Sequence, residues 1–219
     1  SFLISKNLMV VSENLPVKGR PQYGLADISK SEIWNLIQQE INRPDLKFKK
    51  SKINKSYGGV IKDSLAQRAS EHTMLIDKEL KGTLWDLMNT FNEKISNWNF
   101  KLKALEAIQY TIYNTGGEYE WHIDSFPKYK QITDQNTGIK SYIDRKLSIT
   151  IFLNDPNEYE GGEFDIELYS PLNDVRYETF KLSKGSLVFF PSSFWHRVRP
   201  VTSGVRKSLV IWFLGDPFR

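Results

Sequence analysis

The sequence predicts an α+β fold that is mainly β, with helices in its first half packed on one sheet of a jelly roll or a similar two-sheet sandwich. Three observations lead to this prediction. Hydrophobic residues make up 40% of the chain and aromatic residues 13%, which favours a globular, sheet-rich protein. Apolar residues recur at helical spacing before residue 100, and short β-type runs separated by Gly, Pro, Asn and Asp follow from Ala104 onward. Helices first and strands after are typical of the α+β class.

Two helices are expected in the first half. Ser29 or Ser31 can cap a helix that continues to Arg43 with its apolar residues on one face, and Pro44 then ends it. A second helix is expected over about 77–96. Eight strand-like runs follow, which is enough for a two-sheet jelly roll. These runs are 104–113, 118–123, 146–153, 163–169, 175–182, 186–190, 194–199 and 206–214.

The 219 residues are expected to form one domain, because no composition shift or low-complexity linker divides the chain. Residues 1–103 would form a helical N-terminal support and residues 104–219 the β core. The apolar runs are far shorter than the roughly 20 residues of a membrane span. Residues 1–15 lack the basic region and the cleavage site of a signal peptide. We therefore expect a cytoplasmic protein without membrane association.

Two polar segments stand out. Between Lys47 and Lys62 there are six lysines and no acid, which fits either an exposed loop or a site for an acidic partner or RNA. The lysine spacing shows no helical or strand face, which favours the exposed loop. The polar stretch from Ser125 to Asp144 is too long for a hairpin turn. We expect residues 125–144 to close over a substrate as a lid, with 44–62 as a second candidate.

The absence of cysteine excludes disulfides, thiolate metal sites and a cysteine nucleophile, so any metal needs His and carboxylate ligands. His122 and Asp124 lie two residues apart at a predicted strand, so both side chains point to one face with Cα atoms about 6.6 Å apart. If His196, in another predicted strand, pairs near them, the three form a 2-His-1-carboxylate facial triad, which suits Fe(II). Zinc hydrolases use a similar ligand set, so these residues alone leave the metal open.

Arg206 lies ten residues after His196, in the last predicted strand. A buried Arg offers a planar fork that binds a carboxylate through two hydrogen bonds, and Ser208, two residues along on the same face, adds a hydroxyl. Together they fit the distal carboxylate of 2-oxoglutarate. Taken alone, Arg206 would be more simply explained by a structural ion pair. Its place after the run 185–191 and His196 favours the carboxylate site.

Five segments of the second half carry motifs in a fixed order. They are 110–124 (YTIYNTGGEYEWHID), 145–155 (RKLSITIFLND), 159–164 (YEGGEF), 185–191 (GSLVFFP) and 196–206 (HRVRPVTSGVR). Together they resemble the 2-oxoglutarate oxygenases of the prolyl 4-hydroxylase type, which include small bacterial and phage-like members. The resemblance spans roughly residues 104–216, about half of the chain.

This resemblance implies a double-stranded β-helix in which His122, Asp124 and His196 hold catalytic Fe(II), and in which Tyr113 hydrogen-bonds 2-oxoglutarate. Oxygen is the second co-substrate, and ascorbate is an expected stimulant. The implied reaction hydroxylates an unactivated C–H bond and releases succinate and CO2. By resemblance alone, the favoured substrate is a prolyl residue in a protein or peptide.

The resemblance also implies which aromatic residues line the pocket, namely Tyr119 and Trp212. Arg145 and Trp121 are weaker candidates for substrate contact, since a structural or surface role fits each of them better. The chain departs from some prolyl hydroxylases at Phe152, where these enzymes carry a Tyr that contacts 2-oxoglutarate. Many collagen-type members use Lys where this chain has its carboxylate-binding Arg, so the chain looks closer to the oxygen-sensing and microbial members.

Three alternative functions stay open. A nucleic-acid dealkylase of the same superfamily would share the triad, but that branch carries a second Arg where this chain has Trp212. A non-catalytic metal-binding β-barrel would ignore 2-oxoglutarate, and Arg206 with Tyr113 argues against it. A zinc hydrolase needs a general base, for which Glu120 and Glu163 are the nearest candidates. The sequence names neither the substrate nor the oligomeric state.

Overall fold

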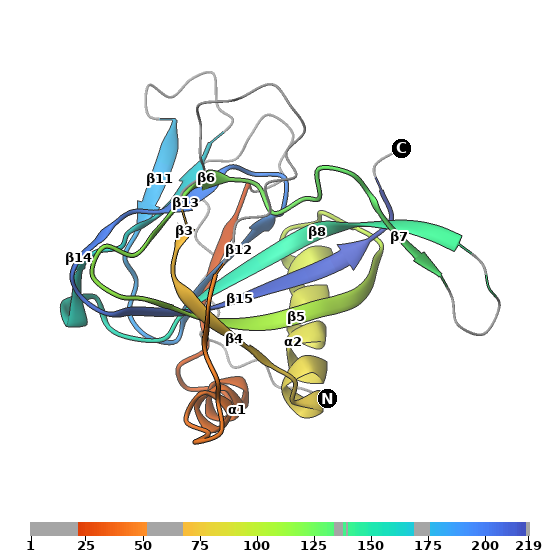
Figure 1. Ribbon diagram of the computed structural model, residues 1–219. Helices are drawn as coiled ribbons and strands as arrows, with labels where there is room; N and C mark the ends of the chain where they lie inside the picture. Colours follow the sequence, from red (N-terminus) through yellow and green to blue (C-terminus); the bar gives the residue numbers. More distant parts are fainter. Residues whose placement is uncertain (1–21, 52–67, 134–137, 139, 169–175, 218–219) are drawn as a thin grey trace.

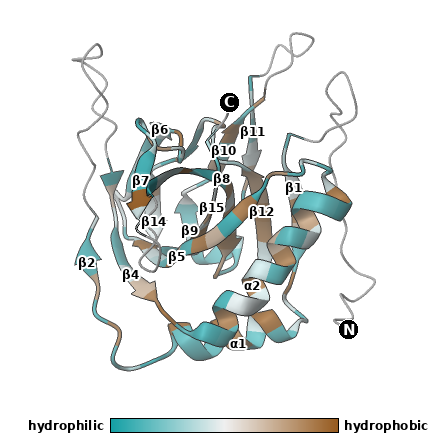
Figure 2. Ribbon diagram, turned by 90° about the vertical axis from the view of Figure 1, so that its right-hand side faces the viewer, coloured by the Kyte–Doolittle hydropathy of each residue, from teal (hydrophilic) through white to brown (hydrophobic). Residues whose placement is uncertain are grey.

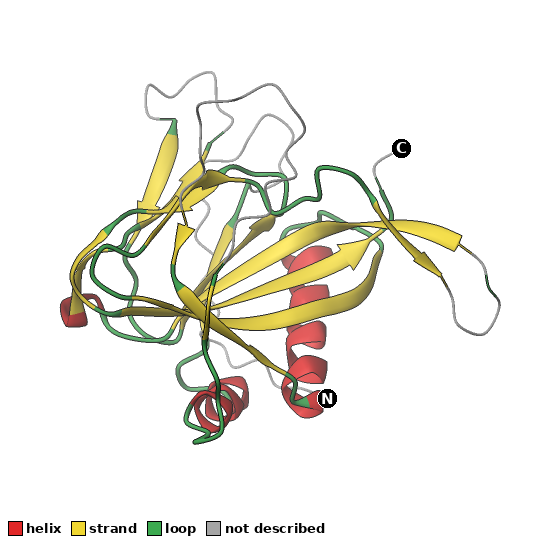
Figure 3. Ribbon diagram, viewed as in Figure 1, coloured by secondary structure: helices red, strands yellow, loops and turns green. Residues whose placement is uncertain are grey.

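In the computed structural model of this protein, two antiparallel sheets face each other and two helices cover the larger one (Figures 1 and 3). The structure describes residues 22–51, 68–133, 138, 140–168 and 176–217. The helical elements are α1 (Glu32–Ile41), α2 (Lys78–Thr90), the π-helical turn η1 (Phe91–Ile95) and the 3-10 turn η2 (Pro156–Glu158). The strands are β1 (Gly24–Asp27), β2 (Lys49–Lys50), β3 (Arg68–Ala69), β4 (Glu71–Leu75), β5 (Leu102–Tyr113), β6 (Glu118–His122), β7 (Lys130–Thr133), β8 (Lys140–Phe152), β9 (Tyr159–Gly161), β10 (Phe164–Glu167), β11 (Tyr177–Phe180), β12 (Ser186–Pro191), β13 (His196–Val198), β14 (Val201–Gly204) and β15 (Arg206–Gly215).

The chain alternates between the two sheets from β5 onward. The large sheet has the order β1-β12-β8-β15-β5-β4-β2, with β7 beside β8, and the small sheet has the order β11-β10-β13-β6-β3. Strands β9 and β14 form a separate pair. Thus β5, β8, β12 and β15 belong to the large sheet, while β6, β10 and β13 between them belong to the small one. This is the jelly-roll arrangement that the sequence predicted.

The central strands of the large sheet are apolar on one face and largely polar on the other, because side chains alternate along a strand. The helix-facing residues of β8 and β15 are buried in one apolar cluster with α2: Leu147, Ile149, Ile151, Leu209, Ile211 and Phe213. The residues that point to the opposite face of these two strands include Ser148, Thr150, Arg206 and Ser208, which are also buried. These polar side chains lie between the sheets, where the candidate site is found.

Both predicted helices are present, and both use the capping residues that the sequence offers. Ser31 caps α1, and Asp77 caps α2 by accepting a hydrogen bond from the backbone N–H of Leu80 at 2.7 Å. The second helix is regular only to Thr90 and then widens into η1. Figure 2 shows both helices on one side of the large sheet. In η1, Phe91 stacks on Phe189 of β12 with ring centroids 3.9 Å apart, which ties the helix layer to the sheet.

Strands β1 and β4 lie in the part of the chain for which helices alone were expected. Strand β1 pairs with β12, and β4 pairs with β5, so both extend the large sheet. Runs this short carry too little alternation to be predicted, and they become strands because β12 and β5 offer them free edges. None of the described helices is long and apolar enough to cross a membrane.

The polar stretch from Ser125 to Asp144 is not the irregular loop that was expected. Residues 130–133 pair with 140–143 as strands β7 and β8, and Figure 1 shows this hairpin projecting from the body of the protein. The expectation was wrong because β8 begins inside the polar stretch, at Lys140, and continues into the core of the protein. Residues 134–137 and 139 lie outside the described part, as does 52–62 of the lysine-rich segment.

Candidate active site

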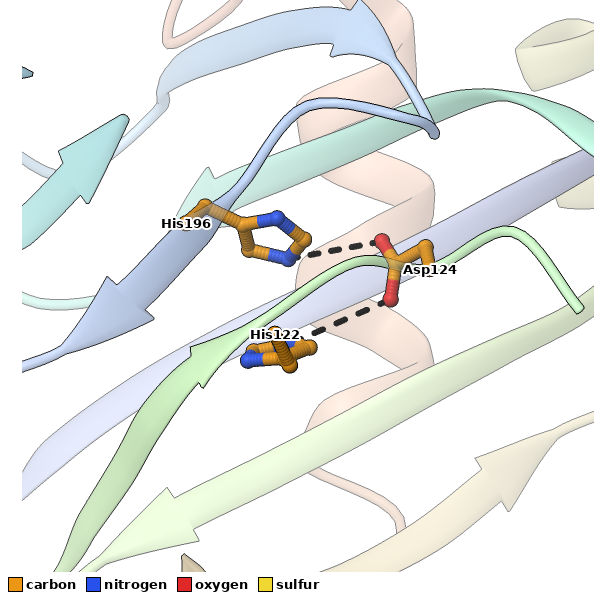
Figure 4. A group of neighbouring side chains, drawn as sticks. All are labelled: His122, Asp124 and His196. Atoms are coloured by element: carbon orange, nitrogen blue, oxygen red, sulfur yellow. Dashed lines mark ion pairs between the residues drawn. The ribbon is translucent and has the colours of Figure 1, made fainter. Parts of the chain in front are cut away.

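His122, Asp124 and His196 come together between the sheets (Figure 4). His122 ends β6 and His196 begins β13, and these two residues are paired across the antiparallel strands with ring centroids 4.1 Å apart. Asp124 follows two residues after β6. One ligand atom from each side chain lies within 4.8 Å of the others, and all three residues are buried. The structure therefore confirms the juxtaposition that the sequence predicted.

Backbone carbonyls fix the orientation of both imidazole rings. The Nδ1 of His122 lies 2.7 Å from the carbonyl oxygen of Glu120, and the Nδ1 of His196 lies 3.0 Å from that of Phe194. A neutral imidazole that donates from Nδ1 keeps its lone pair on Nε2. The Nε2 atoms face Asp124, at 4.0 Å from Oδ1 for His122 and 3.5 Å from Oδ2 for His196. Two nitrogen ligands and one oxygen ligand thus converge.

Ser148 binds the carboxylate of Asp124 and Ser192 supports both residues, and neither serine was predicted from the sequence to have a role. Ser148 Oγ donates to Asp124 Oδ2 at 2.8 Å and lies 2.8 Å from Ser192 Oγ. The backbone N–H of Asp124 donates to the carbonyl of Ser192 at 2.9 Å. Ser148 comes from β8 and Ser192 follows β12, so only the folded chain brings them together. The inward position of Ser148 in an alternating strand was the one signal that pointed to it.

Burial and charge set the protonation of the triad. Burial, followed by the neighbouring His196, lowers the pKa of His122 well below its usual range. Burial alone would raise the pKa of Asp124, but His196 and His122, with smaller contributions from Arg145 and Ser148, lower it overall. A neutral imidazole and an ionised carboxylate are the forms that bind a divalent metal. The site is therefore suited to a metal at neutral pH.

A β-bulge places Tyr119 beside His122. Only Arg197 separates His196 from Val198 on β13, whereas two residues separate Tyr119 from His122 on β6, so the register shifts by one. Tyr119 and His122 therefore share a face and stack, with ring centroids 3.5 Å apart and an interplanar angle of 17°.

Trp121, the neighbour of His122 in β6, points to the opposite face of the small sheet, as ordinary strand alternation predicts. There the guanidinium carbon of Arg197 lies 4.8 Å from its ring centroid, and Tyr177 packs against its edge. Trp121 does not line the cavity of the triad, and it lines a separate surface hollow instead. The expectation that it contacts a substrate at the triad therefore has no support in the geometry.

Arg206 is a buried cation with unsatisfied donors. Only 1% of its surface is exposed, its Nη1 donates to Ser208 Oγ at 3.0 Å, and its Nε and Nη2 have no hydrogen-bond partner among the described residues. It stands opposite Tyr113 in the register of β15 and β5, with its guanidinium carbon 5.3 Å from that ring and 5.4 Å from the ring of Phe152. Burial lowers its pKa. An unpaired buried guanidinium is costly, and a carboxylate ligand would satisfy it.

The triad and Arg206 line one cavity of about 600 Å³. Four further predicted residues line it as well: Tyr113, Tyr119, Ser208 and Trp212. The start of the expected lid, residues 125–127, also contributes to the wall. Glu120 and Glu163 are absent from the lining, although strict strand alternation would have placed Glu120 on the face of the triad. The bulge in β6 explains this difference.

Arg145 lines the same cavity but is held in place by its neighbours. Its Nε donates to Glu106 Oε2 at 2.6 Å, and its guanidinium carbon lies 4.0 Å from the ring centroid of Trp212 and 5.0 Å from that of Phe126. Glu106 was not predicted from the sequence, and it reaches the cavity from β5. Arg145 is thus an ordered part of the wall beside the triad.

Residues 108–214 match the family model described as the 2OG-Fe(II) oxygenase superfamily. This part of the chain belongs to that superfamily. The matched residues, which we call the oxygenase region, contain the site. The family description names Fe(II), for which His122, Asp124 and His196 form the facial triad.

Bacterial relatives of the oxygenase region are known by sequence. It is 38% identical over 104 residues to a PKHD-type hydroxylase of Teredinibacter turnerae, covering 48% of this chain and 41% of that protein. A PKHD-type hydroxylase of Pseudomonas fluorescens is 35% identical over 100 residues, covering 46% and 39%. The matches therefore span about two-fifths of the length of these relatives.

Solved structures show the same double-stranded β-helix fold at lower identity. A prolyl-4-hydroxylase of Pseudomonas putida superposes with a TM-score of 0.58 at 18% identity, covering 90% of this chain and 94% of that one. The viral collagen prolyl hydroxylase of Paramecium Bursaria Chlorella virus-1 gives 0.57 at 20% identity, covering 89% and 96%. A Trichoplax adhaerens prolyl hydroxylase in complex with a peptide fragment gives 0.56 at 14% identity, covering 88% and 83%. The predicted fold is thus confirmed.

Proposed function

We propose that this protein is an Fe(II)- and 2-oxoglutarate-dependent dioxygenase that hydroxylates an unactivated C–H bond, in a prolyl residue of a protein or peptide. The single observation that carries the proposal is Arg206, a buried guanidinium with two unpartnered nitrogens in the same cavity as a buried facial triad. A metal site alone needs no such cation. A metal site that binds a keto acid with a second, distal carboxylate does need one.

Each residue of the cavity takes a definite role in this proposal. His122, Asp124 and His196 would hold Fe(II), which supplies the oxidation of the C–H bond by oxygen, coupled to the conversion of 2-oxoglutarate to succinate and CO2. Arg206 and the hydroxyl of Ser208 would bind the distal carboxylate. Tyr113, paired with Arg206 across the strands, would donate its hydroxyl to 2-oxoglutarate. The aromatic side chains that line the cavity, Tyr119, Phe126 and Trp212, would exclude water from the reacting atoms.

The prolyl substrate is supported by the comparisons and by the wall of the cavity. The sequence relatives are named PKHD-type hydroxylases, and the structural neighbours are named prolyl hydroxylases. Tyr119, Trp212 and Phe126 present aromatic surfaces beside the triad, against which a pyrrolidine ring packs favourably. Residues 125–127 contribute to this wall, which supports the proposal that the 125–144 segment covers the substrate.

The alternatives fit the cavity less well. A dealkylase of the superfamily would carry a second Arg where Trp212 stacks on Arg145. A zinc hydrolase would need a general base beside the metal, and neither of the two candidates, Glu120 and Glu163, lines the cavity. A metal-binding barrel without catalysis leaves the buried charge of Arg206 unexplained.

The test is 2-oxoglutarate turnover by protein loaded with Fe(II) under anaerobic conditions and then exposed to oxygen, with and without proline-containing peptides. We expect the wild type to form succinate, and a peptide to increase the rate. Ascorbate is expected to prolong turnover. His122→Ala should abolish succinate formation, and Arg206→Gln should weaken 2-oxoglutarate binding in calorimetry by about 100-fold.

Arg43→Gln is the matched control for Arg206→Gln. Arg43 is a partly exposed residue whose ion pairs are with Glu40 and Asp45, and it does not line the cavity, so its replacement removes the same charge outside the site. The control should bind 2-oxoglutarate like the wild type. A wild-type protein that neither binds nor consumes 2-oxoglutarate would refute the proposed function.

A further inference from the structure

One wall of the cavity carries three cations, Lys49, Lys50 and Arg68, which we call the cationic wall. Lys49 and Lys50 form β2, and Arg68 begins β3. No carboxylate of the described residues lies within 4.0 Å of their charged nitrogens. Unpaired cations that face a binding cavity attract an anionic group of a ligand.

The other charges of the cavity are already matched. Among the residues that line it, the acids are Asp124, a metal ligand, and Glu106. The carboxylate of Glu106 lies 2.6 Å from Arg145 Nε and 3.9 Å from Lys130 Nζ. Arg206 is buried beside Ser208 and is assigned to the co-substrate. The cationic wall is therefore the part of the cavity whose charge neither the fold nor the proposed co-substrate uses.

Arg68 is held close to the metal ligands. Its guanidinium carbon lies 4.7 Å from the ring centroid of Tyr119, and Tyr119 stacks on His122 at 3.5 Å. A single aromatic ring thus separates the guanidinium from a metal ligand. Arg68 Nε donates to Ser70 Oγ at 3.1 Å, which fixes the guanidinium plane, and its terminal nitrogens have no acceptor among the described residues.

The strands that carry the cationic wall favour a peptide as the ligand. In the described part of the fold, β2 is the outermost strand of the large sheet and β3 is the outermost strand of the small one. An outermost strand presents unpaired backbone N–H and C=O groups, which an extended peptide can pair with. A nucleic acid would gain from the charge but not from these backbone groups.

We propose that the cationic wall selects peptide substrates with an aspartate or glutamate within three residues of the hydroxylated position. This inference rests on the proposed function and names the substrate class of that site. An extended peptide advances about 3.3 Å per residue, so a carboxylate two or three residues from the reacting carbon reaches across the Tyr119 ring to Arg68. Lys49 and Lys50 add attraction without fixed geometry.

The experiment uses paired peptides of identical sequence around a central proline, with Asp or Asn placed in turn at each of the three positions on either side. Hydroxylated peptide and succinate are both quantified for the Fe(II)-loaded protein. We expect Asp at one or two positions to raise kcat/KM about tenfold over Asn, mainly through a lower KM. About 0.5 M NaCl should reduce this preference, because salt screens the attraction.

Variants assign the preference to the wall. Arg68→Gln should bring the Asp-to-Asn ratio close to one, and Arg68→Glu should favour a peptide with Lys at the same position. Lys78→Gln removes a charge from an exposed residue of α2 outside the cavity and should keep the wild-type ratio. The charge swap guards against misreading a folding defect, because a misfolded variant would not gain a new preference.

The outcomes separate this inference from the proposed function. Absence of 2-oxoglutarate binding and turnover in the wild type would refute the proposed function. Normal turnover with equal use of Asp and Asn peptides would overturn this inference alone. Activity on an oligonucleotide with none on any peptide would also overturn it, as would an acid preference that survives in Arg68→Glu.

Discussion

Tyr119 and His122 face the same cavity although two residues separate them on β6, because a bulge in β6 absorbs one residue between them. Ordinary alternation would have placed Tyr119 on the face opposite to His122, together with Trp121, and Glu120 on the same face as His122. The stacked pair links the metal ligand His122 to the wall of the cavity. The bulge therefore places an aromatic ring, rather than the Glu120 side chain, beside the metal site.

Tyr119→Ala should weaken metal binding. Loss of the stacked ring leaves His122 held by its single hydrogen bond to the Glu120 carbonyl, and loss of such support typically costs about 10-fold in metal affinity. Calorimetric titration with Mn(II) as a redox-stable probe measures the change. Trp121→Ala is the matched control, since it removes an adjacent aromatic side chain from the opposite face. Equal losses in both variants would contradict the specific role of Tyr119.

Ser148→Ala should also lower metal affinity, by about 10-fold, because Ser148 donates to Asp124 Oδ2 and thereby orients the carboxylate. Ser192→Ala should have a smaller effect, since its backbone carbonyl still accepts from the Asp124 N–H. The same Mn(II) titration measures both. Ser193→Ala, at the exposed neighbouring residue, provides the control and should bind Mn(II) like the wild type. A Ser148→Ala variant with unchanged affinity would show that the serine is dispensable.

Asp165→Asn should destabilise the small sheet. The carboxylate of Asp165 is fully buried and accepts from Arg197 Nε at 2.7 Å, from Arg199 Nε at 2.8 Å and from Thr179 Oγ1 at 2.7 Å. Breaking a buried ion pair by removing one partner costs about 3–5 kcal/mol, reduced here because both arginines are partly exposed. Urea unfolding at neutral pH should show a loss of about 2 kcal/mol.

The effect of Asp165 should depend on pH. Burial would raise its pKa, but hydrogen bonds from Arg199, Thr179 and Arg197 lower it overall. A carboxyl whose pKa is lowered in the folded state stabilises the fold above its unfolded pKa of about 3.9, and this stabilisation is lost as the pH falls through the folded pKa. The difference in free energy of unfolding between wild type and Asp165→Asn should therefore shrink below about pH 4. A difference that is constant from pH 7 to pH 3 would contradict this assignment.

Phe91→Ala should lower the free energy of unfolding by about 3–5 kcal/mol, because the ring is fully buried and stacks on Phe189. Chemical denaturation monitored by circular dichroism measures this loss. Ile76→Ala, at a residue that is 70% exposed, should change stability by less than about 0.5 kcal/mol. If Phe91→Ala were as mild as Ile76→Ala, the helix layer would not be anchored at this stack.

The sequence by itself determined the features that depend on local spacing. Residues two apart on a strand share a face, so the pairing of His122 with Asp124 and of Arg206 with Ser208 was predicted. The capped helices and the jelly-roll class were predicted as well. His196 was added to the predicted metal ligands because of its place in the order of motifs along the chain. The resemblance to a known family added Tyr113 and the identity of the co-substrate.

Only the tertiary structure decided which residues support and surround these pairs. The serines behind Asp124, the bulge that places Tyr119 instead of Glu120 beside His122, and the meeting of β2 with β3 at one cavity all depend on pairing between strands far apart in sequence. Short edge strands carry little periodicity, and a bulge leaves no mark in the alternation of polar and apolar residues. Local sequence spacing is thus enough to predict the metal ligands, whereas the wall of the cavity around them is determined by long-range packing.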